Sequence, residues 1–239
     1  MAVIQMDFMS GALQRWTTAQ ILLPEDVKKG EKLKTLILLH GNGGNHTDWL
    51  NYSNIARYVR PYPLAVILPD GDNSYYLNFP ERGEYYEEFI AKELPELMGC
   101  TFPLSDKRED TFIAGLSMGG GAAIRMGLRR GDVFSKAAGL SSGLTVQAEA
   151  RMVGHGSDIY AAYEEGKQKE PPYEMARLFL SIGEEDPLLH INRRFHTFLE
   201  KEGVDHVYEE HPGAHNWDFW DGHIRDVLAF LMPEEKEGR

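Results

Sequence analysis

The stretch "GLSMGGGAAI", residues 115–124, surrounds a single serine, Ser117, with glycines. The apolar run "TFIA" precedes it and the helix-forming stretch "GGAAIRMGL" overlaps its end, so Ser117 is predicted to lie on a strand-to-helix turn. Glycine allows a neighbouring backbone to approach closely. The sequence therefore indicates a tight turn that keeps large side chains away from an exposed serine hydroxyl.

The five residues "GLSMG" fit the G-x-S-x-G nucleophile elbow, in which a strained turn projects a serine from the carboxyl edge of a sheet. We expect Gly115 and Gly119 to be small because the strand and the helix pack against them. The positive end of the following helix would favour an anion that develops at the serine. The alternative interpretation is that the glycines 119–121 only allow the helix to pack closely.

Short apolar runs alternate with amphipathic stretches, and most of these runs lack polar alternation. Such runs are typical of strands that are covered on both faces, and strands that alternate with helices form parallel sheets. We therefore predict an α/β fold with a mostly parallel sheet and helices on both faces. The expected strands are residues 35–39, 64–68, 111–114, 136–140, 178–182 and 206–209, and the expected helices are residues 51–59, 84–98, 119–129, 192–201 and 215–231.

Two segments fall outside this alternation. Residues 2–23 have the character of one or two further strands, antiparallel at the edge of the sheet. Residues 145–173, which contain "EEGKQKEPP", fit neither pattern and are predicted to form a small irregular insertion or cap. Because one-domain α/β folds commonly reach roughly 250 residues, residues 1–239 are expected to form a single domain.

Composition excludes several classes of partner. The formal net charge of −12 repels nucleic-acid phosphates and anionic membranes, so neither is expected as a partner. The single cysteine, Cys100, excludes an internal disulfide and fits a reducing compartment. No basic-then-apolar leader opens the chain and no apolar run is as long as a membrane span. We expect a cytoplasmic protein, and a homo-oligomer is compatible with this composition.

A serine nucleophile needs a base, and the base needs an acid that orients it. Asp186 follows the expected strand "LFLSI", and His215 lies after "HVYEE" in the loop before the last helix. Ser117, Asp186 and His215 therefore all fall beyond carboxyl ends of strands, at the edge where α/β active sites form. Glu184 and Glu185 remain alternatives for the acid, and His211 remains the alternative for the base.

Ester chemistry also needs backbone donors for an oxyanion. One candidate is the N–H group of Met118, which follows the serine. The glycine-rich stretch "LLHGNGGNHTDW" supplies the other, with Asn42 as first choice and Gly43 as second; the alternative is that this stretch is only a flexible turn.

A metal centre is not expected. His211 and His215 have the H-x-x-x-H spacing, but Pro212 and Gly213 between them break the helix that such a pair of ligands needs. Acyl transfer through a serine requires no cofactor, so we predict neither a metal nor a cofactor.

Five stretches together resemble the esterase D group of α/β-hydrolases. They are "LLHGNGGNHTDW", "ILPDGDNSYYLNFP", "GLSMGGGAAIRMGL", "FSKAAGLSSG" and "PGAHNWDFW". Within this group they are most similar to the compact bacterial tributyrin esterases. The resemblance runs over residues 21–230 and implies the α/β-hydrolase fold. It implies Ser117 as nucleophile, His215 as base and Asp186 as acid. It also implies oxyanion donors at Asn42 and Met118. The group includes S-formylglutathione hydrolases, which are usually longer and richer in cysteine than this chain.

These residues predict a serine carboxylesterase that acts on small-molecule esters through an acyl-enzyme. Short acyl groups are expected, because the insertion at residues 145–173 is short and mostly polar. Five aromatic residues are candidates for a pocket floor: Tyr75, Tyr76, Phe79, Trp217 and Trp220. The alternative is that most of them belong to the core. The substrate-binding candidates are Gly43, Trp217 and Tyr75. The alternatives are an acetyl-xylan or feruloyl esterase, an S-formylglutathione hydrolase, and a non-catalytic binding protein on a hydrolase scaffold.

Overall fold

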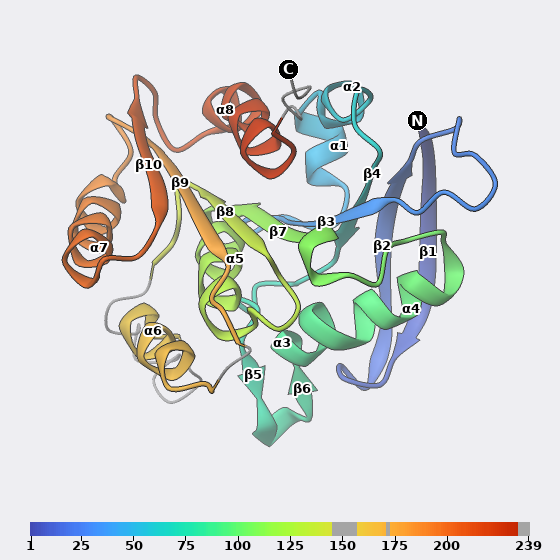
Figure 1. The fold of residues 1–239 in the computed structure, drawn as a ribbon, viewed down its shortest axis with the longest axis horizontal. Coiled ribbons are helices and arrows are strands. Elements are labelled where there is room, and N and C mark those ends of the chain that lie inside the picture. The colour runs from blue at the N-terminus through green and yellow to red at the C-terminus, as the bar shows by residue number, and fades with distance from the viewer. Residues whose placement is uncertain (145–156, 171–172, 234–239) are drawn as a thin grey trace, which may run out of the picture.

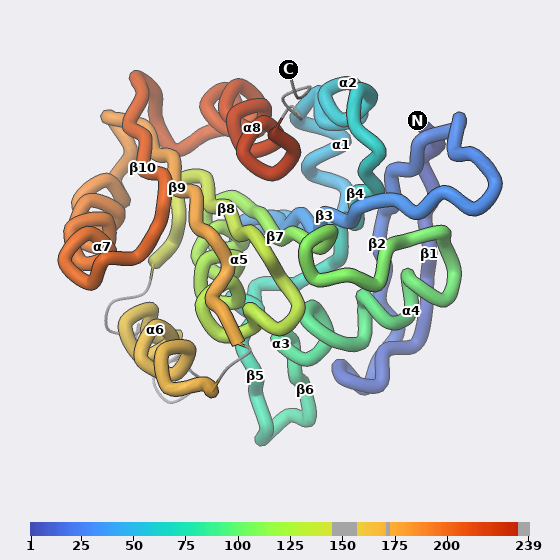
Figure 2. Tube along the Cα trace, viewed as in Figure 1, coloured from blue at the N-terminus to red at the C-terminus, as the bar shows by residue number. Residues whose placement is uncertain are grey.

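A computed structural model of the chain describes residues 1–144, 157–170 and 173–233. Its centre is an eight-stranded sheet in the order β1-β2-β4-β3-β7-β8-β9-β10. The strands from β4 to β10 in this order run parallel, and β2 is antiparallel to both of its neighbours. β1 and β10 lie at opposite ends of the sheet (Figures 1 and 2). The predicted fold class is confirmed.

The central parallel strands are apolar on both faces, as the sequence predicts, and every residue of β4 and β7 is buried. The opening stretch forms β1 and β2, an antiparallel pair at the edge of the sheet, which is also the expected arrangement. A separate two-stranded hairpin consists of β5 and β6. The strands are β1 (Ala2–Ser10), β2 (Arg15–Leu23), β3 (Lys34–Leu39), β4 (Leu64–Pro69), β5 (Asn78–Phe79), β6 (Glu84–Tyr85), β7 (Thr111–Leu116), β8 (Lys136–Leu140), β9 (Arg177–Gly183) and β10 (His206–His211).

Helices cover both faces of the sheet (Figure 1). α1, α2 and α8 pack on one face, against side chains such as Leu36 and Val66, whereas α4, α5 and α7 pack on the other, against Ile37 and Ile67. Adjacent strand residues point to opposite faces, so each strand contributes to both cores. Within the described ranges, none of the helices combines the length and apolar character needed to cross a membrane. The α-helices are α1 (Asp48–Tyr52), α2 (Ile55–Tyr58), α3 (Tyr86–Glu88), α4 (Leu94–Thr101), α5 (Ser117–Arg129), α6 (Ile159–Lys167), α7 (Leu189–Glu202) and α8 (Trp217–Leu231).

Two of the predicted helices are interrupted. The stretch 51–59 is divided between α1 and α2. The N–H group of Asn54 donates to the carboxylate of Asp221 on α8 at 2.6 Å, whereas in a continuous helix this N–H group would donate to a backbone carbonyl of the preceding turn. The stretch 84–98 is not helical throughout, since Glu84–Tyr85 form strand β6, and a π-helical segment, Phe89–Glu93, lies between α3 and α4. Pro95, two residues after this segment, has no N–H group to donate, so the regular α-helical hydrogen-bond ladder is broken there.

The insertion contains a helix that the sequence pattern did not predict. Asp158 caps α6 by accepting hydrogen bonds from backbone N–H groups of its first turn. Near its other end, Gly166 packs against the backbone of Leu128, and Glu165 forms an ion pair with Arg129 at 2.7 Å. These contacts place the end of α6 at the end of α5 that lies away from Ser117, so this part is not a cap over the serine. Residues 145–156 and 171–172 of the insertion lie outside the described residues.

Candidate active site

Ser117 is the first residue of α5 and directly follows the last residue of β7. Its φ of +51° lies in the left-handed region, which a residue with a side chain adopts only under strain. A Cβ atom on Gly115 would lie 2.5 Å from the backbone of Gly119, and one on Gly119 would lie 2.5 Å from the carbonyl oxygen of His40. The two glycines therefore allow the close packing that the elbow needs, as the sequence predicts.

Ser117, His215 and Asp186 come together at the carboxyl edge of the sheet, each after a different strand. The hydroxyl of Ser117 donates to Nε2 of His215 at 2.9 Å. Nδ1–H of His215 donates to Oδ2 of Asp186 at 2.8 Å. The imidazole is thereby held in the tautomer whose Nε2 lone pair faces the serine.

Asp186 is buried, in contrast to Glu184 and Glu185, which are exposed beside it. Burial by itself raises the pKa of the Asp186 carboxyl, but hydrogen bonds from His215, from the N–H group of Leu188 and from the hydroxyl of Ser141 outweigh it and leave the pKa lowered. The carboxylate therefore stays ionised next to the imidazole, where it can stabilise an imidazolium.

His211, the alternative base, does not reach the serine. It is the last residue of β10, and its Nε2 lies 3.2 Å from a carboxylate oxygen of Glu209. Its ring stacks on that of His223 on α8, with centroids 4.3 Å apart. Among the described residues, the group of side chains arranged to hold a metal ion is His211, His223 and Asp226. His215 is not part of this group.

Ser141 and Trp220 complete the surroundings of Asp186 and His215, and sequence reasoning assigned neither of them this place. Ser141 follows β8, is fully buried and has a φ of +48°, so its hydroxyl is held in a strained turn. The indole ring of Trp220 meets the His215 ring edge-on, with centroids 5.1 Å apart. Ser141 lies inside "GLSSG", but nothing in that motif indicates that its hydroxyl faces the acid.

The loop after β3 lies beside the serine, as an oxyanion site requires. A Cβ atom on Gly41 would be 3.5 Å from the Cβ atom of Ser117. Buried His40 anchors this loop: its Nε2 accepts the N–H of Gly71 at 2.9 Å, and its Nδ1–H donates to the Gly41 carbonyl oxygen at 2.8 Å. Burial lowers the pKa of His40, which keeps its ring neutral and able to accept.

Among the described residues, no acceptor is found for the N–H groups of the two predicted oxyanion donors. In the part of the chain that the structure describes, neither Asn42 nor Met118 donates a backbone hydrogen bond to another residue. The N–H of Gly43, the second choice, instead donates to Oδ1 of Asn73 at 2.6 Å, and Gly43 itself has a φ of +80°. Of Asn42 and Gly43, Asn42 is therefore the better candidate, because its N–H group has no acceptor among the described residues.

The predicted pocket residues have different surroundings. Trp217 packs edge-on against Trp49 and Trp220, with ring centroids 5.2 and 5.3 Å away, and so belongs to an aromatic cluster next to His215. Tyr75 packs partly buried against the apolar core on the α5 side. The guanidinium of buried Arg125 donates to the carbonyl oxygen of Tyr75 at 2.9 Å and fixes this strained loop, in which Tyr75 has a φ of +54°.

This elbow on a doubly covered parallel sheet, with a histidine and a carboxylate at the same edge, defines the class of the protein as a serine hydrolase of the α/β-hydrolase fold. Residues 10–231 match the family model described as "Putative esterase". An acetyl esterase of Caldicellulosiruptor saccharolyticus is 36% identical, over 97% of this chain and 98% of that protein.

Solved structures agree with this class. FphF, a fluorophosphonate-binding serine hydrolase of Staphylococcus aureus, superimposes with a TM-score of 0.88 at 29% identity and covers 98% of this chain and 99% of its own. An S-formylglutathione hydrolase of the same organism has a TM-score of 0.86 at 30% identity and covers 96% and 98% of the two chains. The chain belongs to the esterase family that its residues match, and it is a carboxylic ester hydrolase of the serine esterase type.

Proposed function

We propose that this esterase hydrolyses short-chain acyl esters and that Ser117, His215 and Asp186 are its catalytic triad. The observation that carries this proposal is the unbroken line of hydrogen bonds from the Ser117 hydroxyl through His215 to Asp186, of 2.9 and 2.8 Å. The strained backbone of Ser117, which exposes the hydroxyl at the elbow, supports the same assignment.

In the proposed reaction, Ser117 Oγ attacks the ester carbonyl carbon while Nε2 of His215 takes the hydroxyl proton. The imidazolium then protonates the leaving alcohol, and the acyl group remains on the serine. Water, deprotonated by His215, attacks this acyl-enzyme and releases the acid. Asp186 keeps its negative charge throughout and stabilises the imidazolium, consistent with its lowered pKa.

The N–H groups of Asn42 and Met118 are the proposed donors to the oxyanion. Both are free of protein acceptors within the described residues, and the glycine next to Asn42 packs close to the serine. Losing one such donor typically raises the barrier by roughly 3–4 kcal/mol.

The preference for short acyl groups rests on three observations. The relative that is 36% identical is an acetyl esterase. The described part of the insertion, α6, packs at the end of α5 away from Ser117 and so does not extend an acyl channel above the serine. The indole ring of Trp220 lies against the His215 ring, and Trp217 packs on Trp220, so bulky side chains occupy space beside the proposed base.

The test of the triad uses a fluorophosphonate probe and the variant Ser117→Ala. The parent protein should be labelled at Ser117, as identified by mass spectrometry of the labelled peptide, whereas Ser117→Ala should be unlabelled and should lose at least about 10⁴-fold in kcat. Ser135→Ala, which removes a serine hydroxyl elsewhere in the fold, serves as the matched control and should be labelled normally. A label on another serine, or an active Ser117→Ala variant, would overturn the assignment.

A further inference from the structure

A second group of chemically active side chains lies between β10 and α8, outside the proposed triad. His211 is the last residue of β10, and His223 and Asp226 lie on successive turns of α8. One ligand atom from each of these residues lies within 4.8 Å of those from the other two. The two imidazole rings stack with an interplanar angle of 19°, and Nδ1–H of His223 donates to Oδ2 of Asp226 at 2.8 Å. The packing of β10 against α8 thus holds His211 next to His223, twelve positions further along the chain.

The outer surroundings of His211 fit a metal ligand. A histidine that binds a metal through one ring nitrogen usually donates the other N–H to a carboxylate, which fixes the tautomer. Glu209 offers such a carboxylate, 3.2 Å from Nε2 of His211. If Nε2 carries the hydrogen, the lone pair of His211 is on Nδ1 and is available to a cation. Glu209 also adds a negative charge beside the group.

We propose that His211, His223 and Asp226 form a binding site for a divalent transition-metal ion of the zinc type. Two imidazoles and one carboxylate are ligands that Zn²⁺ prefers, and three protein ligands leave a position for water. Metal–ligand bonds of about 2 Å place the donor atoms of a tetrahedral site roughly 3.3 Å apart. Rotation of the side chains is therefore sufficient to bring the three atoms from within 4.8 Å of one another onto one ion. The ion replaces the proton that His223 now shares with Asp226.

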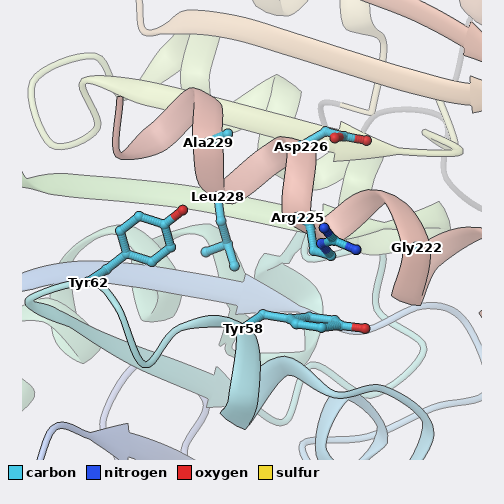
Figure 3. A pocket seen from close by; sticks show the side chains of 7 residues that line it. All are labelled: Tyr58, Tyr62, Gly222, Arg225, Asp226, Leu228 and Ala229. Carbon is cyan, nitrogen blue, oxygen red and sulfur yellow. The ribbon is translucent and has the colours of Figure 1, made fainter. Parts of the chain in front are cut away.

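The guanidinium of Arg225, the residue before Asp226, does not occupy the position proposed for the metal ion. A cavity of about 490 Å³ lies between α2 and α8, and Figure 3 shows the Asp226 side chain directed away from the rings of Tyr58 and Tyr62 across it. The guanidinium of Arg225 lies over the ring of Tyr58, 5.8 Å from its centroid. Arg225 is thus held on the tyrosine side of α8, while the carboxylate of Asp226 bonds to His223.

A metal ion at this position would join the two ends of the segment that carries His215. His211 is the last residue of β10, His215 lies in the loop that follows, and α8 begins at Trp217. β10 is one of the two edge strands of the sheet and, within the described residues, pairs only with β9. Because the ion binds both β10 and α8 in the folded state only, it should stabilise the fold.

The experiment measures the binding of Zn²⁺ alone to the chelator-treated full chain by isothermal titration calorimetry, together with thermal unfolding. The parent should bind one ion at this group and should melt at a higher temperature with Zn²⁺ than with chelator. His223→Phe keeps an aromatic ring for packing, and Asp226→Asn keeps the side-chain shape. Each variant should weaken binding by at least ~10-fold and abolish the Zn²⁺-dependent rise in Tm.

His196→Ala is the matched control, because His196 and His206 form a separate pair of imidazoles, 2.8 Å apart between ring nitrogens. This control should bind Zn²⁺ as the parent does. The proposal is wrong if the parent binds no Zn²⁺, if His223→Phe and Asp226→Asn bind it unchanged, or if His196→Ala is the variant that loses it. Melting in chelator shows whether each variant is folded, and Co²⁺ bound to the parent should give visible absorption bands that are absent from His223→Phe.

Discussion

The indole N–H of Trp220 donates a hydrogen bond to Oγ of Ser141 at 3.0 Å, which leaves the hydroxyl hydrogen of Ser141 for the carboxylate of Asp186. Trp220 therefore acts on the proposed acid through Ser141, as a positioning residue. It also contacts the ring of His215, so the same side chain touches the proposed base and is linked to the proposed acid through Ser141.

Trp220→Phe should lower kcat with little change in KM, because the ring is kept while the N–H donor to Ser141 is lost. A hydrogen bond of this kind contributes about 1 kcal/mol, which corresponds to roughly five-fold in rate. Steady-state kinetics with a soluble ester measures the effect. In a double-mutant cycle, Trp220→Phe should have no further effect once Ser141→Ala is present. Fully additive losses would show that Trp220 acts independently of Ser141.

The buried neutral His40 should make the protein less stable in mild acid. Because burial lowers its pKa in the folded state, the unfolded chain binds this proton more readily, so stability falls as the pH decreases below about 6.5. The loss from this group is at most about 1.4 kcal/mol per pH unit. His40→Gln keeps an acceptor for Gly71 but does not titrate, so its free energy of unfolding in urea should fall less between pH 7 and pH 5. Parallel pH profiles of parent and variant would contradict this account.

Gly119→Ala should destabilise the fold, because its Cβ atom would meet the carbonyl oxygen of His40 at 2.5 Å. Overpacking of this kind typically destabilises by about 1–3 kcal/mol. Gly99 in α4 is the matched control, since a Cβ atom there has no neighbour within 4 Å. Gly99→Ala should be neutral or stabilise by up to about 1 kcal/mol. Urea unfolding measures both, and equal effects of the two substitutions would show that the elbow is not closely packed.

His215→Ala should remove most of the turnover, at least about 10³-fold, because no other described base contacts Ser117. His211→Ala should change kcat less than about three-fold, since His211 bonds to Glu209 instead. Single-turnover measurements with a p-nitrophenyl ester separate acylation from release of the acid. The reverse ordering of the two variants would assign the base to His211.

The value of kcat/KM should peak between acetyl and butyryl esters and should fall beyond about six carbons. Each added methylene contributes only ~0.8 kcal/mol when it is buried, and it contributes nothing once the pocket is full. A series of p-nitrophenyl esters, measured below and above micelle formation, tests this. Acetylated xylo-oligosaccharides, feruloyl esters and S-formylglutathione belong in the same panel. A rate that still rises at octanoate, or that increases sharply at the micelle threshold, would contradict the short-chain preference while leaving the triad intact.

Local patterns were sufficient to predict the sheet, because strands covered on both faces must be continuously apolar and glycines 115 and 119 mark the elbow. They also selected Asp186 and His215, since the carboxyl ends of parallel strands meet at one edge. The hydrogen bonds of Ser141 were not predictable, because they join residues from β8, β9 and α8 whose side-chain directions depend on packing. The use of the Gly43 N–H by Asn73 depends in the same way on a loop that is distant in sequence.

The position of His215 after an edge strand has a consequence for how activity returns during refolding. Ser117 follows β7, which lies in the interior of the sheet, whereas His215 follows β10, which among the described residues is joined to the sheet only through β9. With His215 as the proposed base, a chain in which only β3, β7 and α5 had assembled would hold the serine but would lack its base until β10 docks. Recovery of ester hydrolysis after dilution from denaturant therefore reports the completion of the sheet at this edge. For the same reason, a nascent chain cannot turn over substrate until the residues after β10 have emerged from the ribosome.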